Sequence, residues 1–127
     1  MELVYAPDSK SGVERHVGST PTVPIMNLND YQQQAKETAI YPKDVAASYL
    51  ALGVAGEAGE VAEEVKKCLR RGYLSDGSDF PDDRLKNLYE ELGDVLWYVA
   101  NLCSELDFRL EDVAKFNIDK LKERHSK

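Results

Sequence analysis

Histidine and cysteine, the residues that bind soft metals most often, are scarce in this sequence, which has two of each. His16 and His125 lie near the two ends of the chain. Cys68 and Cys103 lie in predicted helices without CxxC spacing, so we expect reduced thiols that fill the core or an interface. No apolar run is long enough to span a bilayer, and residues 1–19 lack the apolar segment of a secretory signal. We therefore expect a cytosolic protein.

Positive charge is also in short supply. Sixteen Lys and Arg residues stand against twenty-three Asp and Glu residues, which gives a net charge of -7. This balance argues against binding of a nucleic acid polymer through a basic surface. It leaves room for a phosphate-bearing ligand, because divalent cations can bridge acidic side chains to phosphates. A chain of 127 residues is long enough for one domain with a core of its own.

Regular structure is predicted only after residue 24. Residues 1–24 show no sustained periodicity and contain three prolines and two glycines, so we predict an extended or mobile arm ahead of a domain at 25–127. Helical spacing and cap residues predict four helices in that domain. The first starts after Asn27 or Asn29 and ends before Pro42, and the others span about 44–71, 83–106 and 110–124. Without any strand pattern, the predicted fold class is all-α, an antiparallel bundle of about four helices.

Apolar residues at helical spacing predict which side chains face the core. We expect inward stripes on the last three helices, formed by Val45, Tyr49, Leu52, Ala55, Ala62, Val65 and Leu69, then by Leu85, Leu88, Leu92, Val95, Leu96, Val99 and Leu102, and finally by Val113, Phe116 or Asn117, Ile118 and Leu121. A single unit of this size would still leave an apolar face exposed, which fits an oligomer.

The most informative stretch runs from Gly53 to Val65 and combines glycines with glutamates. Glu57, Glu60 and Glu64 share one stripe of the predicted helix, since i, i+3 and i+7 nearly coincide. Three glycines in the same stretch cost roughly 0.5–1 kcal/mol each relative to alanine. A helix that accepts this cost needs close packing or room for a ligand.

A second acidic pair, Glu91 and Asp94, repeats the i, i+3 spacing on the next predicted helix, again beside a glycine, Gly93. Five carboxylates in one groove would repel one another unless cations neutralised them. Mg²⁺ suits such a site, because it takes oxygen ligands and bridges carboxylates to phosphates. We predict four metal ligands, Glu57, Glu60, Glu91 and Asp94. Glu64 would either lie outside the ligand shell or assist a water molecule that the metal activates for attack.

Two alternatives to the metal site follow from the same residues. Glutamates at this spacing can simply form a solvated helix face. A di-iron carboxylate bundle would need Glu-x-x-His on two helices, and both histidines lie outside the acidic motifs. The cations of residues 66–71, Lys67 among them, can likewise either stabilise the helix C-terminus or contact phosphate.

The two acidic motifs together resemble those of the MazG-like all-α nucleoside triphosphate pyrophosphohydrolases. The chain carries them as Gly56-Glu57-Ala58-Gly59-Glu60 and Glu91-Leu92-Gly93-Asp94-Val95-Leu96-Trp97-Tyr98, and the resemblance covers roughly residues 27–124. It implies hydrolysis of a nucleoside triphosphate to the monophosphate and pyrophosphate, dependent on Mg²⁺, for which Mn²⁺ could substitute. It implies that Glu57, Glu60, Glu91 and Asp94 are metal ligands, and that the phosphates meet Asn117, Lys120 and Arg124. It also implies a homodimer or homotetramer.

Substrate choice stays open. Compact single-domain members of this family occur in phages and bacteria, where they act on particular deoxynucleotides. Tyr31, Gln34, Tyr41 and Trp97 could face a base, although aromatic residues at helical spacing are more often part of a core. One alternative for this chain is a diphosphohydrolase of the same superfamily that acts on dUTP, dCTP or phosphoribosyl-ATP. A non-catalytic helical binding protein is the remaining alternative.

Overall fold

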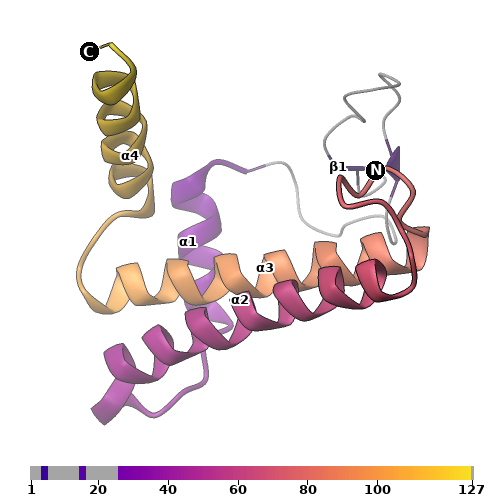
Figure 1. The fold of residues 1–127 in the computed structure, drawn as a ribbon. Coiled ribbons are helices and arrows are strands. Elements are labelled where there is room, and N and C mark those ends of the chain that lie inside the picture. Colours follow the sequence, from indigo (N-terminus) through magenta and orange to yellow (C-terminus); the bar gives the residue numbers. More distant parts are fainter. Residues whose placement is uncertain (1–3, 6–14, 17–25, 127) are drawn as a thin grey trace. The chain divides into compact units, whose positions relative to one another are not determined.

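A computed structural model describes residues 4–5, 15–16 and 26–126, and helices account for most of them (Figure 1). The described α-helices are α1 (Leu28–Glu37), α2 (Ala46–Arg70), α3 (Asp82–Glu105) and α4 (Leu110–His125), with a short 3-10 helix, η1 (Lys43–Val45), ahead of α2. The predicted all-α class is confirmed. No described helix combines the length and the hydropathy that a membrane span requires.

The segment predicted as an arm contains one pair of short strands. β1 (Val4–Tyr5) and β2 (Arg15–His16) pair antiparallel, with Val4 opposite His16 and Tyr5 opposite Arg15. The sequence shows no strand pattern at these residues. A two-residue strand is too short to show the alternation from which strands are predicted. The predicted domain boundary at residue 24 falls outside the described residues.

The chain forms two compact units. One comprises residues 1–24 and 56–94, and the other comprises residues 25–55 and 95–127. We call them the 56–94 unit and the α1/α4 unit. Each receives part of α2 and part of α3, because the divisions fall inside these two helices.

Small side chains and aromatic rings build the core of the α1/α4 unit. Two groups of buried residues form it: Ala35, Ala100, Cys103 and Leu110 in one, and Tyr41, Ala46 and Leu50 in the other. Asn101 is fully buried, and its Nδ2 donates to the backbone oxygens of Ala35 (3.4 Å) and Trp97 (3.1 Å). This amide therefore ties α1 to α3. Burial raises the pKa of the Cys103 thiol.

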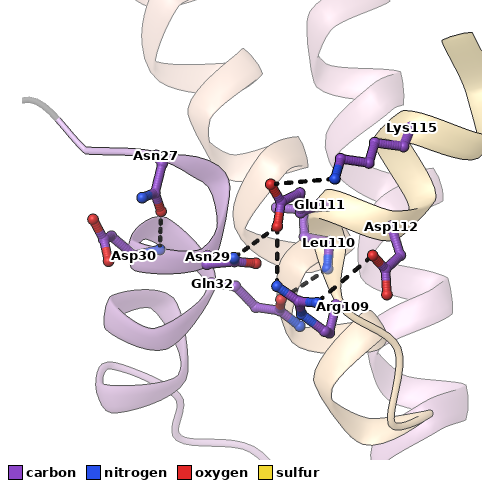
Figure 2. Close-up of polar contacts among 9 residues, drawn as sticks. All are labelled: Asn27, Asn29, Asp30, Gln32, Arg109, Leu110, Glu111, Asp112 and Lys115. Carbon is purple, nitrogen blue, oxygen red and sulfur yellow. Dashed lines mark hydrogen bonds and ion pairs between the residues drawn. The ribbon is translucent and has the colours of Figure 1, made fainter.

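Helix α4 receives its N-terminal cap from α1. Arg109 stands at the N-cap position but makes no side-chain cap bond. Instead, Gln32 Oε1 accepts from the backbone N–H of Leu110 at 2.8 Å, and Gln32 Nε2 donates to the backbone oxygen of Phe108 at 2.9 Å. Asn29 also donates to Glu111 at 2.8 Å (Figure 2). These bonds fix the start of α4 against α1 and satisfy a backbone N–H that the helix itself leaves free.

Two helices end with the same backbone motif but with different residues at its critical position. After α2, Gly72 has φ +90°, its N–H donates to Leu69 O, and Tyr73 N–H donates to Cys68 O. After α3, Asp107 has φ +61° and Phe108 N–H donates to Cys103 O. Both are Schellman ends, in which a left-handed residue reverses the chain. Glycine adopts this conformation without steric cost, whereas the second end uses an aspartate.

Several apolar residues that were expected to face the core are exposed. Leu52 on α2 and Phe116 on α4 are each 73% exposed, and Val45, Tyr49, Leu69, Leu92, Leu96, Val113, Ile118 and Leu121 are also exposed. On α2 the shielded line instead contains Leu50, Val54, Glu57, Val61, Glu64 and Cys68. This line is rotated from the predicted stripe and includes two carboxylates, which a pattern of apolar residues cannot reveal.

The loop between α2 and α3 closes over the end of the 56–94 unit. Phe80 and Cys68 are buried there, and the rings of Phe80 and Tyr73 meet edge to face with centroids 6.4 Å apart. Leu74 N–H donates to Asp79 Oδ1 at 2.7 Å, which orders the turn. Cys68 is a free thiol, as is Cys103. Both cysteines thus fill the interior, as their sequence context predicts.

Candidate functional site

Three carboxylates converge in the 56–94 unit. Glu57 on α2 and Glu91 and Asp94 on α3 each offer one oxygen, and these oxygens all lie within 4.8 Å of one another. Glu57 and Glu91 are half-buried, whereas Asp94 is exposed. We call these three residues the acidic triad. It forms because i, i+3 spacing on α3 places Glu91 and Asp94 on the face that Glu57 approaches.

Like charges and burial act together on the central carboxylate of the triad. The pKa of Glu91 is raised above its ordinary value, first by burial, then by a hydrogen bond with Glu57, and then by the negative charges of Glu57, Asp94 and Glu60. A shared hydrogen bond between two carboxyl groups requires a proton on one of them. The crowding of negative charge in the triad therefore favours a bound proton or a bound cation.

The donor set suits a small, hard cation. Mg²⁺ bonds oxygens at about 2.0–2.1 Å, so adjacent ligands of an octahedral site lie about 3 Å apart. The three oxygens lie within 4.8 Å of one another, so the carboxylates would move closer together on binding an ion. The triad offers carboxylate oxygens and no nitrogen or sulfur, which favours Mg²⁺ or Mn²⁺ over softer metals. Glu57, Glu91 and Asp94 are thus the residues that fit such an ion.

The other two predicted acids of the groove stand apart from the triad. Glu60 is exposed and is not among the three residues that converge, although its charge contributes to the raised pKa of Glu91. Glu64 Oε2 accepts from Arg84 Nη1 at 3.3 Å, and both side chains are well shielded, at 14% and 15% exposed. Glu64 therefore has a cation partner rather than a place in the triad.

Sequence reasoning did not single out Arg84. The signal was present in the spacing, because Arg84 and Glu91 are seven residues apart on α3 and share one helical stripe. Glu57 and Glu64 have the same separation on α2. On each helix, the stripe that carries the triad residues thus continues for two turns. It reaches Arg84 on α3 and Glu64 on α2, which have opposite charges.

The glycines directly beside the acids have no close neighbour among the residues that the structure describes. A Cβ atom on Gly56, Gly59 or Gly93 would meet no other atom within 4 Å. Gly53 differs, because a Cβ there would overlap the ring of Tyr98. Close packing thus applies at Gly53, whereas room for a ligand, the other expectation, stays a prediction at the three glycines beside the acids.

The aromatic residues considered for base contact lie in the α1/α4 unit. Trp97 is half-buried, its Nε1 donates to Thr38 Oγ1 at 2.8 Å, and its ring meets Tyr98 edge to face with centroids 5.0 Å apart. The Tyr41 hydroxyl donates to Glu105, and burial together with this acid raises the pKa of Tyr41 to about 12. Both polar groups therefore already have partners within the fold.

The residues expected to meet phosphate lie on two helices. Asn117, Lys120 and Arg124 are exposed on α4 in the α1/α4 unit, and their i, i+3, i+7 spacing places them on one face. Lys67 is half-buried near the end of α2 in the 56–94 unit. All four side chains thus keep some access to solvent.

Two comparisons with known proteins bear on this chain. Residues 46–127 match the model of the MazG nucleotide pyrophosphohydrolase domain. A relative named Gene 37 protein, from Mycobacterium phage L5, is 43% identical over 105 residues, which cover 78% of this chain and 89% of the relative. The matched domain includes the whole acidic triad and supports a nucleotide pyrophosphohydrolase, a hydrolase that acts on acid anhydrides. The chain belongs to the MazG nucleotide pyrophosphohydrolase family.

Proposed function

We propose that this protein hydrolyses a nucleoside or deoxynucleoside triphosphate to the monophosphate and pyrophosphate, with Mg²⁺ as cofactor. The observation that carries the proposal is the convergence of Glu57, Glu91 and Asp94 in the 56–94 unit. Water attacks the α-phosphorus and pyrophosphate leaves. Glu57, Glu91 and Asp94 would hold the cation, which would supply positive charge to neutralise the phosphate oxygens.

The acids of α2 and α3 would have different roles in binding the cofactor. Glu57, Glu91 and Asp94 would bind it directly, and the proton that the raised pKa of Glu91 favours would leave on binding. Glu60 lies one turn from Glu57 and would join as a fourth ligand after a change of rotamer. Glu64 would act one turn further along, in the outer sphere of the site.

Substrate contacts would come from basic and polar side chains. Lys120, Arg124 and Asn117 would bind phosphate from α4, and Lys67 from α2. Trp97 would border the base with the part of its ring that Tyr98 does not cover. Its indole N–H is held by Thr38, so this contact would be stacking rather than a hydrogen bond.

A second copy of the chain would cover the exposed apolar residues of the helices. Leu52 and Phe116 are each 73% exposed, which is costly for large side chains that face water. We therefore propose a homodimer or a homotetramer. The enzyme would act in the cytoplasm, and in the host cytoplasm if its gene belongs to a phage.

The proposal is tested by pyrophosphate release from the eight common NTPs and dNTPs, with Mg²⁺, Mn²⁺ or EDTA. Release that requires a metal supports the proposal, and the preferred base and sugar name the substrate. In water labelled with ¹⁸O, the label should enter the monophosphate, because the attack is at the α-phosphorus. Label in the pyrophosphate would contradict this. If none of the eight is hydrolysed, phosphoribosyl-ATP and modified nucleotides are tried next. Failure of all of them, together with no effect of Mg²⁺ on thermal stability, would favour a non-catalytic binding protein.

A further inference from the structure

A shielded ion pair lies in the same unit as the acidic triad. Arg84 Nη1 and Glu64 Oε2 are 3.3 Å apart, and the two side chains are only 15% and 14% exposed. By contrast, the pair between Lys66 and Glu63 is 63% and 41% exposed. Exposed pairs of that kind contribute little to stability. The pair between Arg84 and Glu64 differs from such exposed pairs, because its guanidinium is shielded and lies in the same unit as the proposed phosphate site.

The pair continues the line of the triad along both helices. Glu57 on α2 meets Glu91 on α3, while Glu64 meets Arg84, so the two helices run antiparallel within this unit. Seven residues separate the members of each helix, which corresponds to two turns or about 10 Å along the axis. The facing sides of the two helices thus carry carboxylates at one position and a guanidinium about two turns away.

This spacing of charges matches a chain of phosphates. If the α-phosphate of a triphosphate lies at the triad, its distal phosphates extend away from the reacting phosphorus. The flexible side chain of Arg84 would reach toward these phosphates from the other side. The guanidinium offers a planar fork of donors that fits phosphate oxygens. In the structure, one of its terminal nitrogens, Nη1, engages Glu64.

Exchange of partners would avoid leaving a shielded charge alone. Removing one member of a buried pair is strongly destabilising, because the other charge is left uncompensated. If a phosphate takes the place of the Glu64 carboxylate, Arg84 stays paired. Arg84 would thus have an anionic partner in both the free and the bound protein.

We propose that Arg84 binds the distal phosphate of the substrate, and that Glu64 positions its guanidinium until the substrate displaces it. This inference rests on the proposed function, because it assumes a triphosphate at the triad. It adds a substrate-binding residue on α3 to those expected on α2 and α4. It also gives Glu64 a role that does not require contact with the cofactor.

The two partners should have opposite effects on phosphate affinity. Inorganic pyrophosphate is titrated into the protein by calorimetry, with Mg²⁺ present, for wild type, Arg84→Gln and Glu64→Gln. Loss of one charge-assisted hydrogen bond predicts a dissociation constant roughly tenfold or more higher for Arg84→Gln. Glu64→Gln should bind more tightly than wild type, because the competing charge is gone. The control Lys86→Gln removes an exposed cation of α3 and should leave the affinity unchanged.

Kinetics give a second readout. Arg84→Gln should raise KM for the triphosphate more than for the corresponding diphosphate, which lacks the distal group. If Arg84→Gln does not fold, Arg84→Lys and Glu64→Gln carry the test, and the lysine variant should bind with intermediate affinity. Weaker binding in both Glu64→Gln and Arg84→Gln, or no change in either, overturns the inference while wild-type hydrolysis leaves the proposed function standing. A wild-type protein that neither binds pyrophosphate nor hydrolyses any nucleotide overturns both.

Discussion

Helices α2 and α3 are used differently in the two units of the molecule. In the α1/α4 unit they contact through Gly53 and Tyr98, and Leu50 and Ala100 are fully buried. In the 56–94 unit they bring carboxylates together, and the glycines beside those acids face open space. Regular helical structure is the same in both. The difference is that close contact between apolar groups stabilises one part, whereas repulsion between like charges in the other favours a ligand.

The largest effect is expected from the triad. Glu91→Gln should reduce pyrophosphate release by more than about 100-fold, since even residues that only support metal ligands cost 10–100-fold when changed. Without metal, the variant should melt at the same or a higher temperature than wild type, because one repelling charge is removed. Glu90→Gln is the matched control, because Glu90 is exposed and lies outside the triad. A Glu91→Gln enzyme with near wild-type rate would remove Glu91 from the ligand set.

Two glycines of α2 should respond to alanine in opposite ways. Gly53→Ala should destabilise the protein by about 1–3 kcal/mol, because the new methyl group overlaps the Tyr98 ring. Gly59→Ala should stabilise it by roughly 0.5–1 kcal/mol, because its Cβ meets nothing and alanine favours helix. Urea unfolding of both variants measures the difference. Equal effects of the two substitutions would contradict the conclusion that α2 is closely packed at Gly53 and open at Gly59.

The pH dependence of the stability of the metal-free protein should show whether the carboxylates of the triad repel one another. Glu91 has a raised pKa in the folded state, so its contribution to stability is present at low pH. That contribution is lost as pH rises through the folded pKa, which lies above the ordinary pKa of a glutamate. The melting temperature should therefore fall with rising pH in this range, less steeply in Glu91→Gln. Saturating Mg²⁺ should flatten the wild-type curve. If melting temperature depends on pH with the same slope in both metal-free proteins, repulsion between the carboxylates of the triad does not destabilise the fold.

The smallest effect concerns the ends of the two helices. Asp107 has φ +61°, where Gly72 has φ +90° at the corresponding position after α2. Asp107→Gly should raise the free energy of unfolding by roughly 0.5–1 kcal/mol, because glycine adopts this conformation without steric cost. Gly72→Asp should lower it by a similar amount. Chemical denaturation resolves both, and a destabilised Asp107→Gly variant would mean that the aspartate makes a favourable contact.

Local signals in the sequence were sufficient for the four α-helices and for some of their ends. Asn27 caps α1, with Asp30 N–H donating to its side chain at 2.8 Å, and Gly72 ends α2. The acidic motifs also identified three residues that converge. These features depend on contacts within a few residues or on one helical period, which a sequence displays directly.

The direction in which each helix faces could not be predicted in the same way. The shielded line of α2 includes Glu57 and Glu64, and a search for apolar stripes assigns such residues to the surface. Arg84 was missed because its partner lies on another helix. The exposure of Phe116 and Leu52 has a related cause, since a sequence shows that a residue is apolar but not which molecule covers it.

The central claim is that Glu57, Glu91 and Asp94 bind a divalent cation. Calorimetric titration of Mg²⁺, with Mn²⁺ in parallel, tests it most directly, in two buffers of different ionisation enthalpy. Wild type and Glu90→Gln should bind the metal and release protons, because the pKa of Glu91 is raised in the free protein. Glu91→Gln should bind much more weakly and release fewer protons. Unchanged metal affinity in Glu91→Gln would contradict the account.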